Sequence, residues 1–168
     1  INSLFDDIVK TRNKKNIFYN YTIDINYSGN KKIKNAKIVP EENYEIIIKN
    51  NRKSKLNPVI IGAGPAGLFC ALILVQNGLK PIIIEQGKKV EERSKDVELF
   101  RKGGILNTMS NVQFGEGGAG TFSDGKLTTN LHSPLCRTVI EQFVRFGAPS
   151  QISYMNKPHI GTDNLIKI

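Results

Sequence analysis

The first third of the chain is patterned as a small α+β unit. Apolar residues recur at helical spacing over residues 4–12, which predicts a short amphipathic helix. Residues 17–27 then alternate apolar and polar side chains with period two, which predicts a long half-buried strand. We therefore expect a small α+β domain over residues 1–50, followed by a polar linker over residues 51–57.

The pattern changes in the second part of the chain, residues 58–168. Val59 to Ile61 is a continuous apolar run, typical of a strand buried on both faces of a parallel sheet. Gly67 to Asn77 predicts an apolar helix that ends at Gly78, and Pro81 to Ile84 predicts a second buried strand. Strand, helix and strand within about 30 residues form a βαβ unit with a right-handed crossover. The predicted fold class is α/β: an incomplete Rossmann-like βαβ domain preceded by the small α+β domain.

A glycine-rich turn joins the first buried strand to the helix. It reads Gly62-Ala63-Gly64-Pro65-Ala66-Gly67, which matches GxGxxG, and Glu85 ends the second strand 23 residues after Gly62. That distance is close to the spacing of about 20 residues between a dinucleotide-binding turn and its ribose-binding acid. GxGxxG alone is weak, but between a strand and a helix it indicates a site for an adenine dinucleotide.

Each residue type in this motif has a physical reason. Gly62 permits the tight turn, and Gly64 lets the backbone approach the pyrophosphate. Gly67 lets the helix pack close to the strand, and the helix N-terminus binds phosphate through its N–H groups and its dipole. Glu85 accepts hydrogen bonds from ribose hydroxyls. The alternative is a glycine-rich connection that binds nothing.

A second glycine-rich segment covers residues 111–127. Glycines at this density fit neither the interior of a helix nor the centre of a strand. A flexible surface loop is one interpretation. We favour contact with a flat polar ligand, because Ser123 and Lys126 place hydrogen-bond donors among the glycines. Residues 115–126 are then expected near the carboxyl ends of the parallel strands, on the side to which the first glycine turn points.

Composition is that of a globular protein, with 39% hydrophobic and 23% charged residues. No apolar run is long enough for a bilayer and no secretory signal opens the chain, which begins at Ile1 as a piece of a longer protein would. Of the two cysteines, Cys70 lies in the predicted helix as a small buried hydrophobe, and Cys136 has no CxxC partner. These features predict a soluble cytoplasmic protein without a disulfide framework.

Most of the net charge of +9 lies in the N-terminal third of the chain, since residues 1–56 hold 12 Lys/Arg against 6 Asp/Glu. A basic segment suits nucleic acid, but lysines spread among Asn, Tyr and Ile are more typical of a solvated face. His132 and His159 lack carboxylate or cysteine neighbours at ligand spacing, so no metal site is expected. We assign no catalytic residue, because a redox dinucleotide carries the chemistry itself and the protein binds and orients it.

Three stretches resemble one family. They are PVIIGAGPAGLFCALILVQNGLKPIIIEQGKKVEERSKDV, NVQFGEGGAGTFSDGKLTT and KPHIGTDNL, within residues 57–168, and they are similar to the NAD(FAD)-utilizing dehydrogenases, flavoproteins of the glutathione-reductase-like type. The resemblance implies non-covalent FAD, with the Gly62 to Gly67 turn on the pyrophosphate, Glu85 on the adenosine ribose and residues 115–126 near the flavin end. The leading interpretation is an FAD-dependent oxidoreductase, with NAD(P)H as a candidate electron source and a small molecule as its unidentified substrate. It also implies that this chain lacks the distal part of the FAD domain. Related flavoproteins often carry an arginine where this chain has Gln86, and Arg93 is the residue that could compensate near the adenine.

The cofactor-binding residues expected on these grounds are Gly62, Gly64, Pro65, Ala66, Gly67, Glu85, Gln86, Arg93, Gly115, Gly117, Gly118, Ala119, Gly120, Ser123, Gly125 and Lys126. Two alternatives stay open. One is an enzyme that uses NAD(P) as its only dinucleotide, since the fingerprint serves both cofactors. The other is a flavin-bearing protein that binds or modifies RNA through its basic N-terminal unit, which steeply salt-dependent RNA binding would favour.

Overall fold

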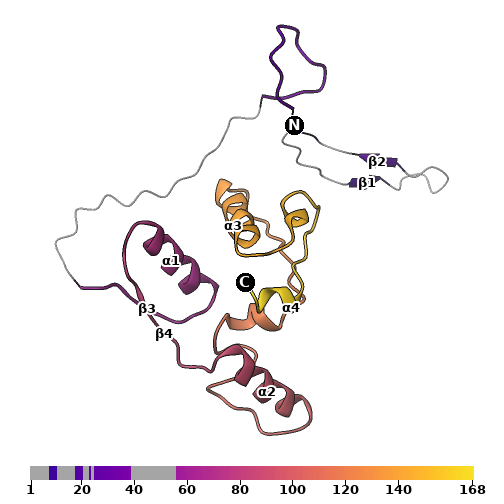
Figure 1. Ribbon diagram of the computed structural model, residues 1–168. Coiled ribbons are helices and arrows are strands. Elements are labelled where there is room, and N and C mark those ends of the chain that lie inside the picture. Colours follow the sequence, from indigo (N-terminus) through magenta and orange to yellow (C-terminus); the bar gives the residue numbers. More distant parts are fainter. Residues whose placement is uncertain (1–7, 11–17, 21–22, 24, 39–55) are drawn as a thin grey trace. The chain divides into compact units, whose positions relative to one another are not determined.

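The computed structural model describes residues 8–10, 18–20, 23, 25–38 and 56–168 (Figure 1). The described chain divides into two compact units. The larger holds residues 56–125 and 161–167, and the smaller holds the described residues up to 38 together with residues 126–160. The candidate site lies within the larger unit.

The larger unit begins with two parallel strands, β3 (Val59–Ile61) and β4 (Ile82–Ile84), connected by α1 (Pro65–Gln76) (Figure 1). The register pairs Val59 with Ile82 and Ile61 with Ile84. The Gly62 N–H adds a hydrogen bond to the Ile84 carbonyl oxygen at 2.7 Å. This order is the predicted βαβ unit, so the α/β class is confirmed here. Because the strands are parallel, both carboxyl ends meet at the glycine turn.

Helix α1 begins two residues before its predicted start. Pro65 occupies its first position, where the fixed φ of the ring suits a helix and an N–H would have no partner within it. At the other end Asn77 is the cap residue, and its side chain donates to the Ile73 carbonyl oxygen at 2.8 Å. Gly78 follows with φ +75°, as predicted for a glycine that ends a helix.

The strands are less buried than their sequence predicted. Ile61 is 78% exposed and Ile84 is 52% exposed, although both strands were expected to be buried on both faces. In the described part of the chain this sheet has two strands, and only α1 packs against β3. Cys70, expected inside the protein, is likewise exposed, because α1 is apolar around its circumference and the sheet covers one side of it.

Helix α2 (Val90–Arg101) is an element that the sequence patterns did not single out. Two glutamates in its first turn and an arginine in its last turn follow the order that the helix dipole favours. It buries one stripe at helical spacing, formed by Val90, Arg93 and Val97. The larger unit also contains the 3-10 helix η1 (Gly118–Phe122) and the short helix α4 (Thr162–Leu165).

In the smaller unit, β1 (Ile8–Lys10) pairs antiparallel with β2 (Phe18–Asn20). The helix predicted over residues 4–12 is therefore wrong at residues 8–10, because pairing with a second strand overrides weak helical spacing. The strand predicted over residues 17–27 is observed at residues 18–20, and the described residues after it, 23 and 25–27, are not in a strand. Most of the predicted linker lies outside the described residues.

The same unit contains α3 (Pro134–Arg145), which packs against the 3-10 helix η2 (Ser150–Ser153). Ser133 caps α3, since its hydroxyl oxygen accepts a hydrogen bond from the Leu135 N–H at 3.2 Å. None of the helices that the structure describes is long and apolar enough to cross a membrane.

Candidate functional site

The turn after β3 carries three glycines in three different environments. Gly62 has φ +99°, a left-handed conformation that glycine adopts most easily. A β-carbon on Gly67 would lie 2.0 Å from the Gly62 carbonyl oxygen, so the close approach of helix and strand requires glycine there. A β-carbon on Gly64 would meet no atom of the described residues within 4 Å. The protein's own packing therefore requires glycine at position 67 but leaves open space beside position 64.

Glu85, at the end of β4, reaches across to this turn. Its Oε2 accepts a hydrogen bond from the Ala63 N–H at 2.7 Å, and its Oε1 accepts one from the Gly87 N–H at 2.8 Å. These hydrogen bonds hold the pKa of the Glu85 carboxyl below its ordinary value, that from Ala63 contributing most. The group is thus a carboxylate at neutral pH. Each oxygen has a further lone pair with which it can accept a hydrogen bond from a ligand hydroxyl.

This hydrogen bonding predicts a loss of stability in acid. Because the folded carboxyl has the lower pKa, the unfolded chain takes up the proton first as the pH falls. The contribution of Glu85 is complete above the ordinary glutamate pKa of about 4.3 and is lost as the pH falls through the folded pKa. Melting temperatures measured from about pH 7 to about pH 3 should converge for wild type and Glu85→Gln. A Glu85→Gln curve parallel to that of wild type over this pH range would contradict the prediction.

The second glycine-rich segment lies directly against the first turn. The Gly117 N–H donates to the Ala63 carbonyl oxygen at 2.9 Å. A β-carbon on Gly118 would lie 3.4 Å from the α-carbon of Gly64. Gly115, Gly117 and Gly118 all have positive φ, so the path of this backbone needs glycine. The predicted placement, near the carboxyl ends of the strands, is confirmed for this part of the segment.

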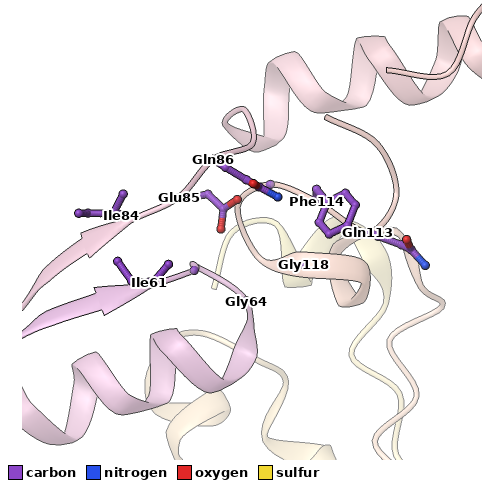
Figure 2. A pocket seen from close by; sticks show the side chains of 10 residues that line it. Ile61, Gly64, Ile84, Glu85, Gln86, Gln113, Phe114 and Gly118 are labelled. Carbon is purple, nitrogen blue, oxygen red and sulfur yellow. The ribbon is translucent and has the colours of Figure 1, made fainter. Parts of the chain in front are cut away.

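A pocket of about 350 Å³ opens between the two glycine-rich segments (Figure 2). The first turn and the ends of the strands form one side, Glu85 stands at its centre, and the second segment forms the other side. Its lining residues are Ile61, Gly62, Gly64, Ile84, Glu85, Gln86, Gln113, Phe114, Gly115 and Gly118. A carboxylate set between apolar groups and bare backbone suits a ligand with both hydroxyl groups and flat surfaces.

Six of the predicted binding residues thus come together in one pocket: Gly62, Gly64, Glu85, Gln86, Gly115 and Gly118. Pro65, Ala66, Gly67, Gly117, Ala119 and Gly120 belong to the same two segments without lining it. Ser123 and Gly125 lie instead beside α4, where the Ser123 carbonyl oxygen accepts a hydrogen bond from the Thr162 hydroxyl. Lys126 pairs with His159 in an isolated β-bridge of the smaller unit. Cofactor contact by any of these residues stays a prediction.

Arg93 lies behind the pocket wall rather than in its lining. It is 0% exposed, and its guanidinium donates hydrogen bonds to backbone carbonyl oxygens of the second glycine-rich segment. Burial lowers the pKa of Arg93, and the charges of Glu85 and Glu116 oppose that shift. Arg93 is buried inside the protein and does not line the pocket. Its contact with the cofactor near the adenine therefore stays a prediction.

Six residues with a part in this site were not predicted to bind the cofactor. Four of them line the pocket: Ile61, Ile84, Gln113 and Phe114. The Glu116 carboxylate accepts a hydrogen bond from the Val90 N–H at 3.0 Å and so caps α2. Gly87 lets two backbones touch, since its β-carbon would lie 2.4 Å from the Gly115 α-carbon. Two features of the sequence could have indicated these roles: Glu116 stands among glycines, and Gly87 follows closely after Glu85.

Comparison with known proteins shows to which family the chain belongs. A strand, a glycine turn, a helix and a second strand that ends in an acid define a dinucleotide-binding domain. Residues 55–154 match the family described as "FAD binding domain", and the chain belongs to that family. FAD is accordingly its cofactor. The small parallel sheet and the pocket at its carboxyl edge fit an α/β FAD-binding fold.

Two relatives illustrate how far the similarity extends. An uncharacterised protein of Clostridium beijerinckii is 43% identical over 169 residues, which covers 95% of this chain and 32% of that protein. The glutamate synthase [NADPH] small chain of Halomonas elongata is 67% identical over 27 residues, 16% of this chain and 6% of that protein. This chain therefore spans about a third of the first relative and a small part of the second.

Proposed function

We propose that the protein is an FAD-dependent oxidoreductase of the dehydrogenase type and that its pocket holds the ADP half of FAD. The observation that carries this proposal is the position of Glu85. Its carboxylate lies between the two glycine-rich segments, at the carboxyl ends of β3 and β4. A hydrogen-bonded carboxylate in that place is suited to accept hydrogen bonds from the ribose hydroxyls.

The residues present fit the cofactor. Gly64 presents bare backbone to open space, as a closely approaching pyrophosphate requires. Among the residues that the structure describes, no side chain caps the N-terminus of α1, so the N–H groups of its first turn suit a phosphate. The volume of about 350 Å³ is at the low end of the ~300–1,000 Å³ typical of ligand pockets. We infer that it takes part of the cofactor rather than all of it.

When bound, FAD supplies the hydride or electron transfer of the reaction. The residues of this chain bind and orient it. Glu85 fixes the adenosine ribose, the start of α1 faces the pyrophosphate, and Gly115 and Gly118 give the remainder of the cofactor a wall without side chains. Under this proposal residues 58–168 are the first part of a Rossmann-like, glutathione-reductase-like FAD domain, preceded by the small domain over residues 1–50.

A nicotinamide cofactor is the electron donor that we favour. The glutamate synthase chain that shares a 27-residue stretch is named for NADPH, which supports NAD(P)H as the reductant here. The substrate class under this proposal is a small molecule, and the compartment is the cytoplasm. A protein that uses NAD(P) alone is the competing proposal for the same fingerprint.

The deciding experiment is to identify the released cofactor. The purified full-length protein should be yellow and should release FAD on denaturation, in about one equivalent per chain, because one glycine turn binds one pyrophosphate. Chromatography of the supernatant together with the visible spectrum distinguishes FAD from FMN and from nicotinamide. Recovery of NAD(P) alone would establish the competing proposal. A folded protein that binds neither when each is added would refute both.

A further inference from the structure

The guanidinium of Arg93 is enclosed by the second glycine-rich segment. Its Nε donates to the Asn111 carbonyl oxygen at 2.7 Å, and its Nη2 donates to the Val112 carbonyl oxygen at 2.9 Å. The carbonyl oxygens of Glu116 and Gly118 accept two further hydrogen bonds from Nη1 and Nη2. One buried side chain thus gathers four carbonyl groups from eight consecutive residues.

The segment also packs closely around the rest of this side chain. A β-carbon on Gly115 would lie 2.5 Å from Cδ of Arg93, so the backbone passes the side chain at a distance that only glycine permits. The ring of Phe122 covers the guanidinium, with its centroid 4.6 Å from Cζ. Arg93 is therefore surrounded by backbone and by an aromatic face, and it does not line the pocket.

A single peptide group links Arg93 to the pocket's opposite side. The Glu116 carbonyl oxygen accepts from Arg93, and the next N–H, that of Gly117, donates to the Ala63 carbonyl oxygen at 2.9 Å. The Ala63 N–H in turn donates to the Glu85 carboxylate at 2.7 Å. Because a trans peptide holds its C=O and N–H in opposite directions, fixing the first fixes the second.

We infer that Arg93 is a positioning residue that holds residues 111–122, within the second glycine-rich segment, in the shape of the pocket wall. Arg93 acts through Gly115 and Gly118 rather than by touching the cofactor. The effect of Arg93 on cofactor binding rests on the proposed FAD site. The planar fork of five donors is what this role requires. A lysine ammonium is a compact charge with three donors and cannot reach four carbonyl groups spread around a plane.

The test compares Arg93→Lys, Arg93→Ala and the control Arg101→Ala, which removes an exposed arginine from the last turn of the same helix. Amide hydrogen exchange of residues 111–122 is measured on the FAD-free protein, and FAD affinity is measured separately by fluorescence titration. Both Arg93 variants should lose protection in this segment. Their FAD affinity should fall by about 10- to 100-fold, the range seen when supporting partners of metal ligands are removed. Arg101→Ala should match wild type.

Chemical rescue supplies a readout that general instability cannot imitate. Methylguanidinium at millimolar concentration should restore protection and FAD affinity to Arg93→Ala, whereas methylammonium at the same concentration should not. If Arg93→Ala does not fold, the Arg93→Lys data decide. Normal protection in Arg93→Lys would overturn the inference, as would weaker FAD binding with normal protection, which would place Arg93 on the cofactor itself. Because protection is measured without FAD, a protein that never binds FAD would refute the proposed function and leave this test intact.

Discussion

Replacing Gly64 by valine is expected to abolish FAD binding while the protein still folds. A β-carbon at this position meets no protein atom within 4 Å, and the backbone there, with φ −76° and ψ 179°, is open to any residue. The valine side chain would instead stand in the space beside the pocket lining. Overpacking of this kind costs about 1–3 kcal/mol even where neighbours can yield. A rigid pyrophosphate cannot yield, so we expect the loss to exceed that range and FAD binding to become undetectable.

Two measurements separate loss of the site from loss of the fold. Flavin content after purification should drop to background, and the thermal midpoint of the FAD-free protein should stay close to that of the FAD-free wild type. Gly64→Ala provides a graded control. Its single methyl group intrudes less into the site, so this variant should bind FAD more strongly than Gly64→Val does. Normal flavin content in Gly64→Val would remove the turn from the binding site.

The glycine turn and its surroundings were predictable because each feature has a local steric or electrostatic reason. GxGxxG between two apolar runs indicates β3, α1 and β4, and Glu85 follows at the spacing that a ribose-binding acid requires. The position of Gly115 to Gly118 was predictable from a sheet rule, since ligands bind beyond the carboxyl ends of parallel strands.

Other features depend on contacts between distant residues, which leave little local trace. Arg93 was named as a residue that could contact the cofactor near the adenine, but four carbonyl groups from residues 111–118 enclose its guanidinium. The need for glycine at position 87 arises only when Gly115 arrives beside it. The apolar runs of β3 and β4 predicted strands correctly and burial wrongly, because burial depends on which elements cover the sheet.

Replacing Gly67 by alanine is expected to destabilise the FAD-free protein, unlike a change at Gly64, because position 67 lies in the protein's own helix–strand packing. The added β-carbon would lie 2.0 Å from the Gly62 carbonyl oxygen and 3.4 Å from Cγ2 of Ile60. A backbone carbonyl cannot move aside as the end of a flexible side chain can, so α1 and β3 must separate. We expect a loss of about 1–3 kcal/mol in the free energy of unfolding, or about 2–12 °C in the thermal midpoint of a protein of this size.

Gly120→Ala is the matched control, because its β-carbon meets nothing within 4 Å and its φ is not left-handed. The thermal midpoint of the FAD-free protein should be unchanged in this control and lowered in Gly67→Ala. FAD binding should weaken in Gly67→Ala as well, since the turn that carries Gly64 moves with the helix. If Gly67→Ala were as stable as the control while losing FAD, position 67 would belong to the ligand's surface. The assignment of close helix–strand packing to Gly67 would then be wrong.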